Sequence, residues 1–577
     1  MKLIKSLKPY AFLLILLVLF TIGQVAANLE LPDYTAQIIN KGIIGGEQEM
    51  ILPTGIKMLI VALIGGVCTV IAGYLSAKVG TGVARDLRKD VFEKVESFSL
   101  SEMNTFTTSS LITRSTNDVQ QLQVVVVMIL RMVTSAPITA VWAIYKATQI
   151  APDMSWIMAL AVGALTVMIF GLSSTVIPRF QLVQKLTDKL NLVVRENLNG
   201  IRVIRAFNNE KVEEKRLLKV NEDLTNLNLF VSRAMALMQP LMFLILNLVS
   251  VSTIWFGAHL VAEYQLGIGD MLAFMQYAIQ VIISFLLISI VFIMIPRALV
   301  SARRISEVLA TEPEIKDPEK SEIPNTNNGI VEFKDVTFGY NKADVPVLEN
   351  ISFTANPGKV TAIIGSTGSG KSTLINLIPR FYDVQYGEIQ IDGVNIKNLT
   401  QKELRSKIGY IPQKPVLFSG TIARNISYGV SSDDKELVSR AAKIAQASDF
   451  IEKFPEKYAT PVSQSGTNLS GGQKQRISIA RAIAKDPEVY IFDDSFSALD
   501  FKTDVKLRHA LSREVKDKTV IIVAQRVNTI INADQIVVLD QGGIVGIGKH
   551  KDLIKTCKVY IEIAKSQLSE TELKKYL

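Results

Sequence analysis

The chain has 577 residues, 48% of them hydrophobic, and a formal net charge of +9 at pH 7. That length exceeds what one hydrophobic core supports and predicts at least two domains. The mean hydropathy of +0.28 argues against a wholly soluble protein and favours the membrane class. The two cysteines, Cys68 and Cys557, exclude a cysteine-rich metal site, and we expect no disulfide between them.

Six long apolar segments precede residue 300, and each has the ~20 residues that a helix needs to cross a bilayer. They span 11–28, 51–77, 122–149, 155–178, 234–262 and 271–296. The first segment resembles a secretory signal, because Lys2, Lys5 and Lys8 precede it and Val25-Ala26-Ala27 ends it. Since five more spans follow, we expect it to remain as the first transmembrane helix.

Lysine and arginine of this half are concentrated in two connections, 78–121 and 179–233, whereas the alternate connections hold almost none apart from Lys41. Basic loops stay on the cytoplasmic side of a membrane. Both termini are therefore predicted to be cytoplasmic in a multi-pass protein of the cell membrane. Much of the net charge is then a topology signal, and no nucleic-acid partner is expected.

Both basic connections are long and contain few helix breakers. They are predicted to extend the membrane helices into the cytoplasm and to contact another domain, with solvated connectors as the alternative. The six spans, as drawn, contain no Asp or Glu. Ion-coupled transporters usually place an ionisable group inside the membrane, so any transport energy is predicted to come from another source. Lys57 and Lys146 lie near span ends, where they can snorkel, and Arg131 has no assigned role.

A polar stripe in the last span and adaptable side chains in the fifth span suggest a cavity. Gln276, Gln280 and Ser284 recur every four residues and so share one helix face. The fifth span contributes Met235, Met238, Met242, Phe243 and Asn247. A cavity for varied amphipathic compounds fits this composition. Helix–helix packing with interhelical hydrogen bonds fits it equally well.

Residues 311–329 are polar, contain three prolines and are predicted to be a linker. They separate a transmembrane domain over 1–310 from a second domain over 330–577. In the second domain, short strand-like runs such as Ile330–Phe333 and Val360–Ile364 alternate with helical stretches. This pattern predicts an α/β domain.

A phosphate-binding loop opens the first clear strand–helix unit of that domain. Gly365-Ser366-Thr367-Gly368-Ser369-Gly370-Lys371-Ser372 fits G-x-x-x-x-G-K-[ST], follows the strand Val360–Ile364 and leads into a helix from Thr373. The glycines allow backbone N–H groups to surround phosphates, Lys371 supplies a cation, and Ser372 offers a hydroxyl to Mg²⁺. ATP and Mg²⁺ are the predicted ligands.

A second apolar strand, Val489–Asp493, ends in a carboxylate. Asp493 stands where a nucleotide-binding domain holds the Asp that helps to bind Mg²⁺. An exposed strand end is the alternative, and the spacing from the phosphate loop argues against it.

Leu469-Ser470-Gly471-Gly472-Gln473 lies between these two elements and resembles the signature of the ABC ATPase family. Other family elements fall at the expected places. Tyr340 resembles the adenine-stacking aromatic, Gln413 the Q-loop glutamine that contacts the metal, and Asp500 ends a D-loop-like Ser497-Ala498-Leu499-Asp500. With six preceding spans, the resemblance covers nearly the whole chain. It implies the ABC exporter fold, in which two ATPase domains sandwich two ATP molecules, and coupling helices near 101–114 and 195–210.

The signature also has a physical interpretation. Ser470, Gly471 and Gly472 at the start of a predicted helix form an anion site. The phosphate loop already covers the phosphates within one domain. The signature is therefore free to cover the ATP of a second domain.

Three positions depart from the family pattern. Asp494 stands where the family has a Glu that polarises the attacking water, and its carboxylate is one methylene shorter. Gln525 stands where the family has a His that contacts the γ-phosphate, and an amide cannot carry a proton. The segment before the signature has Gln464 and lacks the acidic residue found in exporters.

These losses beside an intact phosphate loop and signature resemble the degenerate-site subunit of heterodimeric bacterial multidrug exporters. We therefore expect one half of a heterodimer that exports hydrophobic or amphipathic compounds, with weak hydrolysis at its own site. The partner would be a second half-exporter. The alternatives are a homodimer with Asp494 as a weak base, a lipid or peptide exporter, and a regulatory subunit that uses ATP binding as a switch.

Overall fold

The computed structural model describes residues 6–322, 324, 326–340, 345–430, 434–569 and 573, without the side chains at 181, 291–293, 296 and 297. Lys2 and Lys5, which precede the first span, and linker positions 323 and 325 lie outside these residues. The chain divides into two compact units. The first comprises Met1–Glu96 and Thr107–Glu312, and the second comprises Ser97–Phe106 and Pro313–Leu577.

The first unit is entirely helical where it is described. Its elements are η1 (Lys8–Tyr10), α2 (Ala11–Gln37), η2 (Ile38–Ile44), η3 (Gln48–Met50), α3 (Ile51–Glu96), α5 (Thr108–Thr113), η4 (Arg114–Asp118), α6 (Val119–Met128), η5 (Ile129–Val133), α7 (Thr134–Ile150), η6 (Pro152–Met154), α8 (Ser155–Asn199), α9 (Ile201–Ala206), α10 (Glu210–Ala262) and α11 (Ile268–Ala310).

Six helices in the described part of the chain are long and apolar enough to cross a membrane, which confirms the predicted spans. They are Lys8–Ile44, Gln48–Glu96, Thr108–Ile150, Pro152–Asn199, Glu210–Ala262 and Ile268–Ile290. A helix satisfies every backbone polar group within itself, so it is one of the few structures that hydrocarbon tolerates. Several helices run well beyond the apolar segment that identified them.

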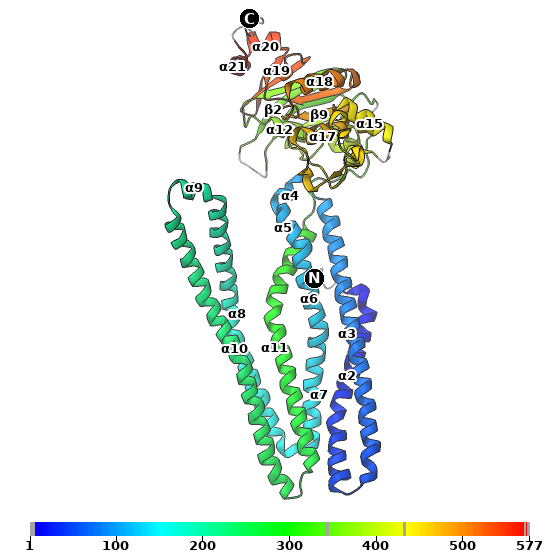
Figure 1. The fold of residues 1–577 in the computed structure, drawn as a ribbon, viewed down its shortest axis with the longest axis vertical. Coiled ribbons are helices and arrows are strands. Elements are labelled where there is room, and N and C mark those ends of the chain that lie inside the picture. The colour runs from blue at the N-terminus through cyan, green and yellow to red at the C-terminus, as the bar shows by residue number, and fades with distance from the viewer. Residues whose placement is uncertain are drawn as a thin grey trace. The chain divides into compact units, whose positions relative to one another are not determined.

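Neighbouring helices of this unit pair along their lengths. Helix α2 packs on α3, α8 packs on α10, and α11 contacts α7, α2 and α10. The hairpin of α8 and α10 carries the short helix α9 at its tip (Figure 1). A buried cluster including Leu29, Met154, Phe274 and Tyr277 holds α2, α7, α8, α10 and α11 together.

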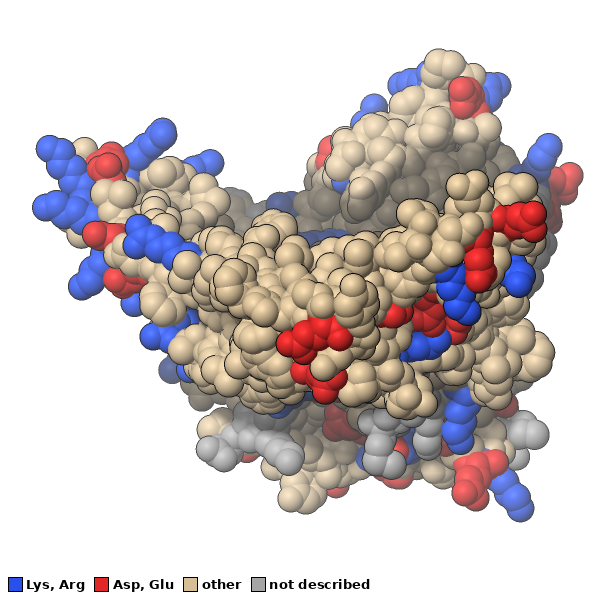
Figure 2. Space-filling view, turned by 90° about the horizontal axis from the view of Figure 1, so that it is seen from below, with Lys and Arg blue, Asp and Glu red and all other residues tan. Residues whose placement is uncertain are grey.

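Charge is distributed unevenly over the helical unit. Figure 2 looks at the end of the bundle that carries the α2–α3, α7–α8 and α10–α11 connections, and most of its near surface is uncharged. Lys and Arg gather on the lobe formed by the α8–α10 hairpin, whose basic stretch is 179–233 (Figure 2). This is the asymmetry on which the predicted orientation depends.

The first spanning helix carries two carboxylates, because α2 continues past residue 28, where the predicted span ended. Lys146 of α7 donates to Glu30 Oε1 and to Asp33 Oδ2, both at 2.7 Å. The hydroxyl of buried Tyr277 of α11 lies 2.6 Å from Asp33 Oδ1 and 2.9 Å from the Leu29 carbonyl oxygen, and it can donate to either. The Lys146 amine, expected to reach the membrane interface, is an ion-pair partner that joins α7 to α2.

The second unit is a mixed α/β structure, most of which follows the helical unit in the chain, and the predicted fold class is confirmed. Its strands are β1 (Val331–Phe338), β2 (Leu348–Ala355), β3 (Val360–Gly365), β4 (Tyr386–Ile391), β5 (Val394–Asn395), β6 (Ile408–Ile411), β7 (Gly420–Thr421), β8 (Pro461–Val462), β9 (Val489–Asp493), β10 (Thr519–Val523), β11 (Gln535–Asp540) and β12 (Gly543–Gly548).

The helices of this unit surround its sheets. They are α4 (Leu100–Phe106), α12 (Lys371–Leu377), η7 (Ile396–Asn398), α13 (Gln401–Ser406), α14 (Ile422–Ile426), η8 (Ser427–Gly429), α15 (Lys435–Ile444), α16 (Ser448–Ile451), η9 (Lys457–Ala459), η10 (Gln464–Gly466), α17 (Gly471–Lys485), α18 (Phe501–Glu514), α19 (Val527–Ile530), α20 (His550–Thr556) and α21 (Lys558–Gln567).

The main sheet has the order β12-β11-β3-β10-β9-β6, with every pairing parallel except that of β12. Alternate residues of each strand enter one of two buried clusters, as for Ile363 and Ile364 of β3. Coverage on both faces explains the continuous apolar runs of these strands. A smaller antiparallel sheet, β2-β1-β4-β5, packs in the second cluster.

Helix α4 belongs to the second unit, although it lies in the sequence between the helices of the first. Glu102 is buried and accepts hydrogen bonds from Ser99 N at 2.7 Å and from Glu314 N at 3.1 Å. Asn104 donates to the Tyr382 hydroxyl at 3.2 Å. These bonds fasten α4 to the segment after residue 312 and to the loop after α12.

The Lys146 cluster generates a stability prediction. Lys146→Met would leave Glu30 and Asp33 without their cation. Because both are partly exposed, we expect a loss of roughly 1–3 kcal/mol, between that of surface and buried ion pairs. The melting temperature of the purified chain in detergent measures it. Lys57→Met is the matched control, since Lys57 is exposed, and an equal effect of both changes would contradict a stabilising cluster.

Candidate functional site

The phosphate loop joins β3 to α12 and depends on glycine at two tight positions. A Cβ on Gly365 would lie 2.2 Å from the Leu539 carbonyl oxygen. Gly370 has φ +94°, and a Cβ there would lie 2.6 Å from Leu348 Cδ2. Neither position accepts another residue without displacement of its neighbours. The loop can therefore turn its N–H groups inward at the start of α12, as an anion site requires.

Lys371 and Ser369 are the polar side chains at the base of this loop. Lys371 Nζ donates to the carbonyls of Gly365 at 2.9 Å and Ser366 at 2.7 Å. Burial lowers the pKa of Lys371, and the negative charges of Asp494 and Asp493 oppose that shift. The Ser369 hydroxyl is buried without a hydrogen-bond partner among the described residues. A buried donor without a partner fits a loop that receives phosphate oxygens.

Asp493 ends β9 beside the loop, as its position in the sequence predicted. Ser372 Oγ lies 3.4 Å from Asp493 Oδ1, so the two predicted metal-binding oxygens are neighbours. Burial raises the pKa of Asp493, the hydrogen bond from Ser372 opposes this, and the charge of Asp494 adds to it. Oxygen donors of this kind fit Mg²⁺, which binds few protein ligands and takes the rest from phosphate and water. Mg²⁺ bound there would neutralise phosphate charge.

Asp494 follows directly and is held by its backbone. Its N–H donates to the Val523 carbonyl at 3.0 Å, and its φ of +45° is left-handed, which Asp tolerates better than most residues. Gln413, which follows β6, donates from Nε2 to Asp494 Oδ2 at 3.4 Å. Burial raises the pKa of Asp494, while hydrogen bonds from Ser497 and Gln413 oppose that shift. The structure therefore places the Gln413 carboxamide beside the carboxylate of Asp494, the position where the family has its base.

Gln525 follows β10, the strand between β3 and β9, and its side chain is exposed. Its backbone carbonyl accepts a hydrogen bond from Gln567 Nε2 at 2.8 Å. The register of the sheet brings the end of β10 beside that of β9, because Val523 pairs with Asp493. Gln525 thus lies at the same edge as Lys371, Asp493 and Asp494.

Tyr340 follows β1 in the smaller sheet and is packed into an aromatic group. Its ring meets Phe338 and Tyr382 edge to face, with centroids 5.0 and 5.1 Å away. Its hydroxyl donates to Thr373 Oγ1 at 3.0 Å, next to the phosphate loop. Tyr340, predicted to stack on adenine, is therefore in direct contact with Thr373 in the first turn of the helix that follows the phosphate loop.

The signature residues form the start of α17. Ser470 Oγ accepts from Gln473 N at 3.3 Å, and Ser470 N donates to Gln473 Oε1 at 2.8 Å. This capping box gives Gln473 a structural role that the sequence analysis missed, although the S-x-x-Q spacing signals it. Leu469 is buried beneath the turn, and Gly471 has no atom within 4 Å of an added Cβ. In the described chain, no hydrogen bond or ion pair connects this motif to the phosphate loop.

Asp500 caps α18 at the end of the D-loop-like segment. Its Oδ1 accepts from Thr503 N at 3.0 Å, and hydrogen bonds from Thr503 lower its pKa. An added Cβ on Gly472 would lie 3.2 Å from the Ala498 carbonyl oxygen. The signature and the D-loop-like segment therefore lie against each other within this unit.

The helical unit contains a separate cavity of about 890 Å³ between η4, α6, α8, α10 and α11. Its lining changes from polar to apolar along α8. Polar and charged lining groups include Asn117, Asp118, Gln121, Gln184, Asp188 and Arg304, and apolar groups include Ile169, Leu172, Val176, Phe180, Met235 and Met238.

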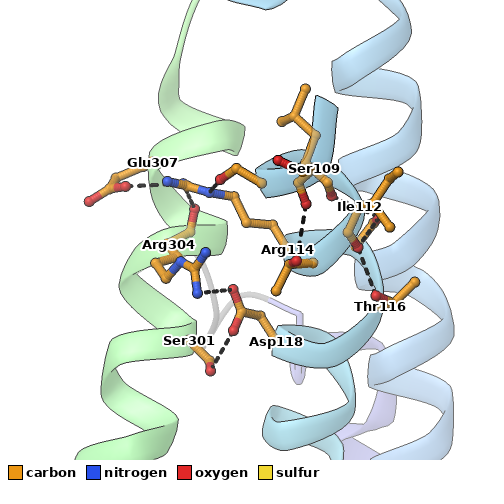
Figure 3. Close-up of polar contacts among 12 residues, drawn as sticks. Ser109, Ile112, Arg114, Thr116, Asp118, Ser301, Arg304 and Glu307 are labelled. Carbon is orange, nitrogen blue, oxygen red and sulfur yellow. Dashed lines mark hydrogen bonds and ion pairs between the residues drawn. The ribbon is translucent and has the colours of Figure 1, made fainter. Parts of the chain in front are cut away.

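An ion cluster that includes the lining residues Asp118 and Arg304 lies beside this cavity, and Figure 3 shows its contacts. Asp118 accepts from Ser301 Oγ at 3.0 Å and pairs with Arg304 Nη1 at 3.4 Å. Arg114 donates to the Arg304 carbonyl at 2.5 Å and to Glu307 Oε2 at 3.0 Å. The cluster joins the helix that follows α5 to the last turns of α11.

The sequence allowed two interpretations of the polar stripe and the methionines, a substrate cavity and helix–helix packing. Each interpretation applies to some of these residues. Met235 and Met238 line the cavity. Ser284 is buried and donates to the carbonyl of Gln280 in its own helix. Gln280 Nε2 lies 3.4 Å from the Asn28 carbonyl of α2, which is an interhelical contact. Met242 is buried in the helix-packing cluster.

Two family models match the chain. Residues 14–305 match the ABC transporter transmembrane region, and residues 348–497 match the ABC transporter model. The second range contains the phosphate loop, the signature, Asp493 and Asp494.

Relatives extend this match over nearly the full length. An uncharacterized ABC transporter ATP-binding protein of Mycobacterium tuberculosis is 39% identical, covering 98% of this chain and 97% of its own. An ATP-dependent lipid A-core flippase of Syntrophus aciditrophicus is 32% identical, with 91% and 87% covered. A solved bacterial Atm1-family ABC exporter with ATP bound is 26% identical, has a TM-score of 0.81 and covers 98% of this chain and 99% of its own.

The packing of Tyr340 generates a prediction on ATP affinity. Tyr340→Ala removes the ring that would stack on adenine, a contact of about 1–3 kcal/mol, so we expect the Kd for ATP to rise about 5- to 150-fold. Tyr340→Phe keeps the ring and loses only the bond to Thr373, and its Kd should change less than about tenfold. Titration of the full chain with a fluorescent ATP analogue measures both. Equal effects would show that the hydroxyl, not the ring, is the important group.

Proposed function

Because this chain belongs to the ABC transporter family and is an ATPase that couples hydrolysis to transport across a membrane, we propose that it is the degenerate-site half of a heterodimeric exporter. Its own phosphate loop would hold ATP with slow turnover. Its signature motif would complete the competent ATP site of a second half-exporter. Hydrophobic or amphipathic compounds would be the transported substrates.

The paired change at Asp494 and Gln525 is the observation that carries this proposal. Both residues follow adjacent strands at the edge that holds Lys371 and Asp493. The Asp494 carboxylate is one methylene shorter than that of Glu, and a displacement of ~1 Å of a catalytic group can cost about 100-fold in rate. Gln525 donates a hydrogen bond but cannot hold a proton. ATP binding would persist, because Tyr340, Lys371, Ser372 and Asp493 are all present.

The signature supports the second half of the proposal. The capping box uses the backbone N–H groups of Ser470 and Gln473. The N–H groups of Gly471 and Gly472 form no hydrogen bond with the described part of the chain, and these two residues have no side chain that could cover them. Free N–H groups and the helix dipole there favour a phosphate oxygen. Among the described residues, no hydrogen bond or ion pair joins that turn to its own phosphate loop, so the ATP of another chain is the suitable ligand.

Half-exporters of this family work as dimers, and the α8–α10 hairpin offers a docking surface. Around α9, Leu198, Val203 and Phe207 are 70%, 60% and 72% exposed, and Arg202 and Arg205 flank them. Three large apolar side chains that are this exposed on a basic loop, predicted to be cytoplasmic, suit a protein partner better than water. We assign this surface to the ATPase domain of the second half-exporter, with α4 and α9 as the two coupling helices.

The cavity supports an amphipathic substrate. Its apolar part lies along the membrane-spanning stretch of α8, and its polar part lies beyond it, beside Asp118 and Arg304. A compound with an apolar body and a polar head would match both parts. A lipid exporter is the second candidate, because one relative is named a lipid A-core flippase. In either case the ATPase domain would face the cytoplasm of a cell-membrane protein.

The proposal predicts that the purified chain alone has little steady-state ATPase activity. Asp494→Glu combined with Gln525→His should raise its rate, by up to about 100-fold, because both missing groups return. Phosphate release from the full chain in nanodiscs measures this. Asp517→Glu is the control, since Asp517 is exposed and lies away from the site. A robust rate of phosphate release from the unchanged chain would contradict the heterodimer. If the double variant shows no gain in rate, other residues such as Gln464 cause the slow turnover.

The proposal also predicts an asymmetry between two motifs of this chain. Lys371→Ala weakens ATP binding at the slow site, so transport should fall while part of the hydrolysis survives. Gly472→Leu should block the approach of the signature to the partner's ATP. Loss of an oriented donor beside developing charge costs about 2.7–4 kcal/mol, or roughly 10²–10³ in rate. Hydrolysis should therefore fall much further in the Gly472 variant.

Both variants are measured in the reconstituted pair at saturating ATP, with Lys516→Ala as the exposed control. Unchanged ATP binding at its own phosphate loop shows that the Gly472 variant is folded. Greater damage from Lys371→Ala would mean that the two sites are equivalent or that their roles are reversed.

A further inference from the structure

The last helix of the chain is hydrogen-bonded to the segment that carries Gln525. Gln567 is the final residue of α21, and its carboxamide bridges that segment. Nε2 donates to the carbonyl of Gln525 at 2.8 Å, and Oε1 accepts from the N–H of Val527 at 2.8 Å. One side chain thus holds the backbone on both sides of Arg526.

The bridged segment has other supports as well: the Gln525 N–H bonds the Asp494 carboxylate, Val527 is fully buried, and Arg508 Nη1 donates to the Thr529 carbonyl at 3.1 Å. Ala524 N still donates to the Ile363 carbonyl at 3.1 Å, as the last bond of the sheet. Helix α19 begins at Val527, and its N-cap, Arg526, makes no side-chain capping bond. Because the first N–H groups of a helix have no partner within it, they need one from outside. Gln567 supplies that partner and closes the turn between β10 and α19.

Helix α21 is itself fixed in the core. Tyr560 and Ala564 are fully buried, and Leu568 is nearly so. The Tyr560 hydroxyl lies 2.7 Å from His550 Nδ1 of α20. With these residues as anchors, the position of Gln567 is determined by the fold. Gln567 in turn holds the carbonyl of Gln525.

We propose that Gln567 is a positioning residue for the γ-phosphate contact of this ATP site, acting through the backbone of Gln525. The inference rests on the proposed role of Gln525. A contact residue in a loop binds its ligand more tightly when its backbone is already ordered, because ordering costs free energy on binding. The γ-phosphate distinguishes ATP from ADP, so the contribution of Gln567 is specific for the triphosphate.

Two variants separate the bonds of Gln567. Gln567→Leu removes both bonds at similar size. Gln567→Glu keeps an acceptor for Val527 N–H but loses the donor, and it places an anion against the Gln525 carbonyl. The loss of one or two hydrogen bonds should raise the Kd for a non-hydrolysable ATP analogue about three- to tenfold, with the Kd for ADP unchanged. Lys565→Ala, an exposed change on the same helix, is the matched control and should change neither Kd.

Calorimetric titration of the full chain in nanodiscs, with Mg²⁺, measures these constants. Gln525→Ala is the reference: it should itself weaken the ATP analogue selectively, and Gln567→Leu should then add nothing. If Gln525→Ala leaves the preference for triphosphate unchanged, the proposed role of Gln525 is wrong. If Gln525→Ala weakens the ATP analogue selectively but Gln567→Leu has no effect, the positioning role of Gln567 is wrong. The role is also wrong if Gln567→Leu weakens binding of the ATP analogue and of ADP equally.

Discussion

The parallel register of β3, β10, β9 and β6 determines the ATP site. Val523 pairs with both Ile363 and Asp493, and Phe492 pairs with Ile411, so the four strands end at one edge. In an open parallel sheet, ligands bind outside the carboxyl ends of the strands. Residues separated by more than a hundred positions in the chain therefore converge beside the phosphate loop. A shift of one residue in the β3–β10 or the β10–β9 pairing would separate Asp493 from Ser372.

The helical unit obeys a different constraint, since each backbone polar group within a bilayer needs a partner in the same chain. Long helices satisfy it and also carry the chain beyond the membrane, as α3, α8 and α10 do. Several charged groups of this unit are paired between helices. The Glu30–Asp33–Lys146 group and the Arg114–Asp118–Arg304 group are examples, and each joins different helices.

Sequence patterns predicted the elements better than the contacts between them. The six spans and the phosphate loop depend on local composition and spacing, so they could be read along the chain. The partners of Lys146 could not, because α2 continues past its apolar run and nothing local indicates where it ends. Gln567 gave no signal either, since it lies 42 residues from Gln525 and belongs to no motif. The capping role of Gln473 could have been predicted from its spacing to Ser470, but Gln473 was interpreted only as part of the family signature.

The backbone of the site explains how its chemistry can change while its shape persists. Asp494 is held by its N–H on the Val523 carbonyl, and Gln525 is held by its carbonyl on Gln567. Neither bond involves the side chain that differs from the family pattern. The phosphate loop likewise depends on glycine backbone and on Lys371 bonded to main-chain carbonyls. Under the proposed function, Asp494 and Gln525 would therefore shorten the base and replace a proton carrier with little cost to folding. A pair of sites that began as equals could diverge by this route, with one site specialised for binding and the other for hydrolysis.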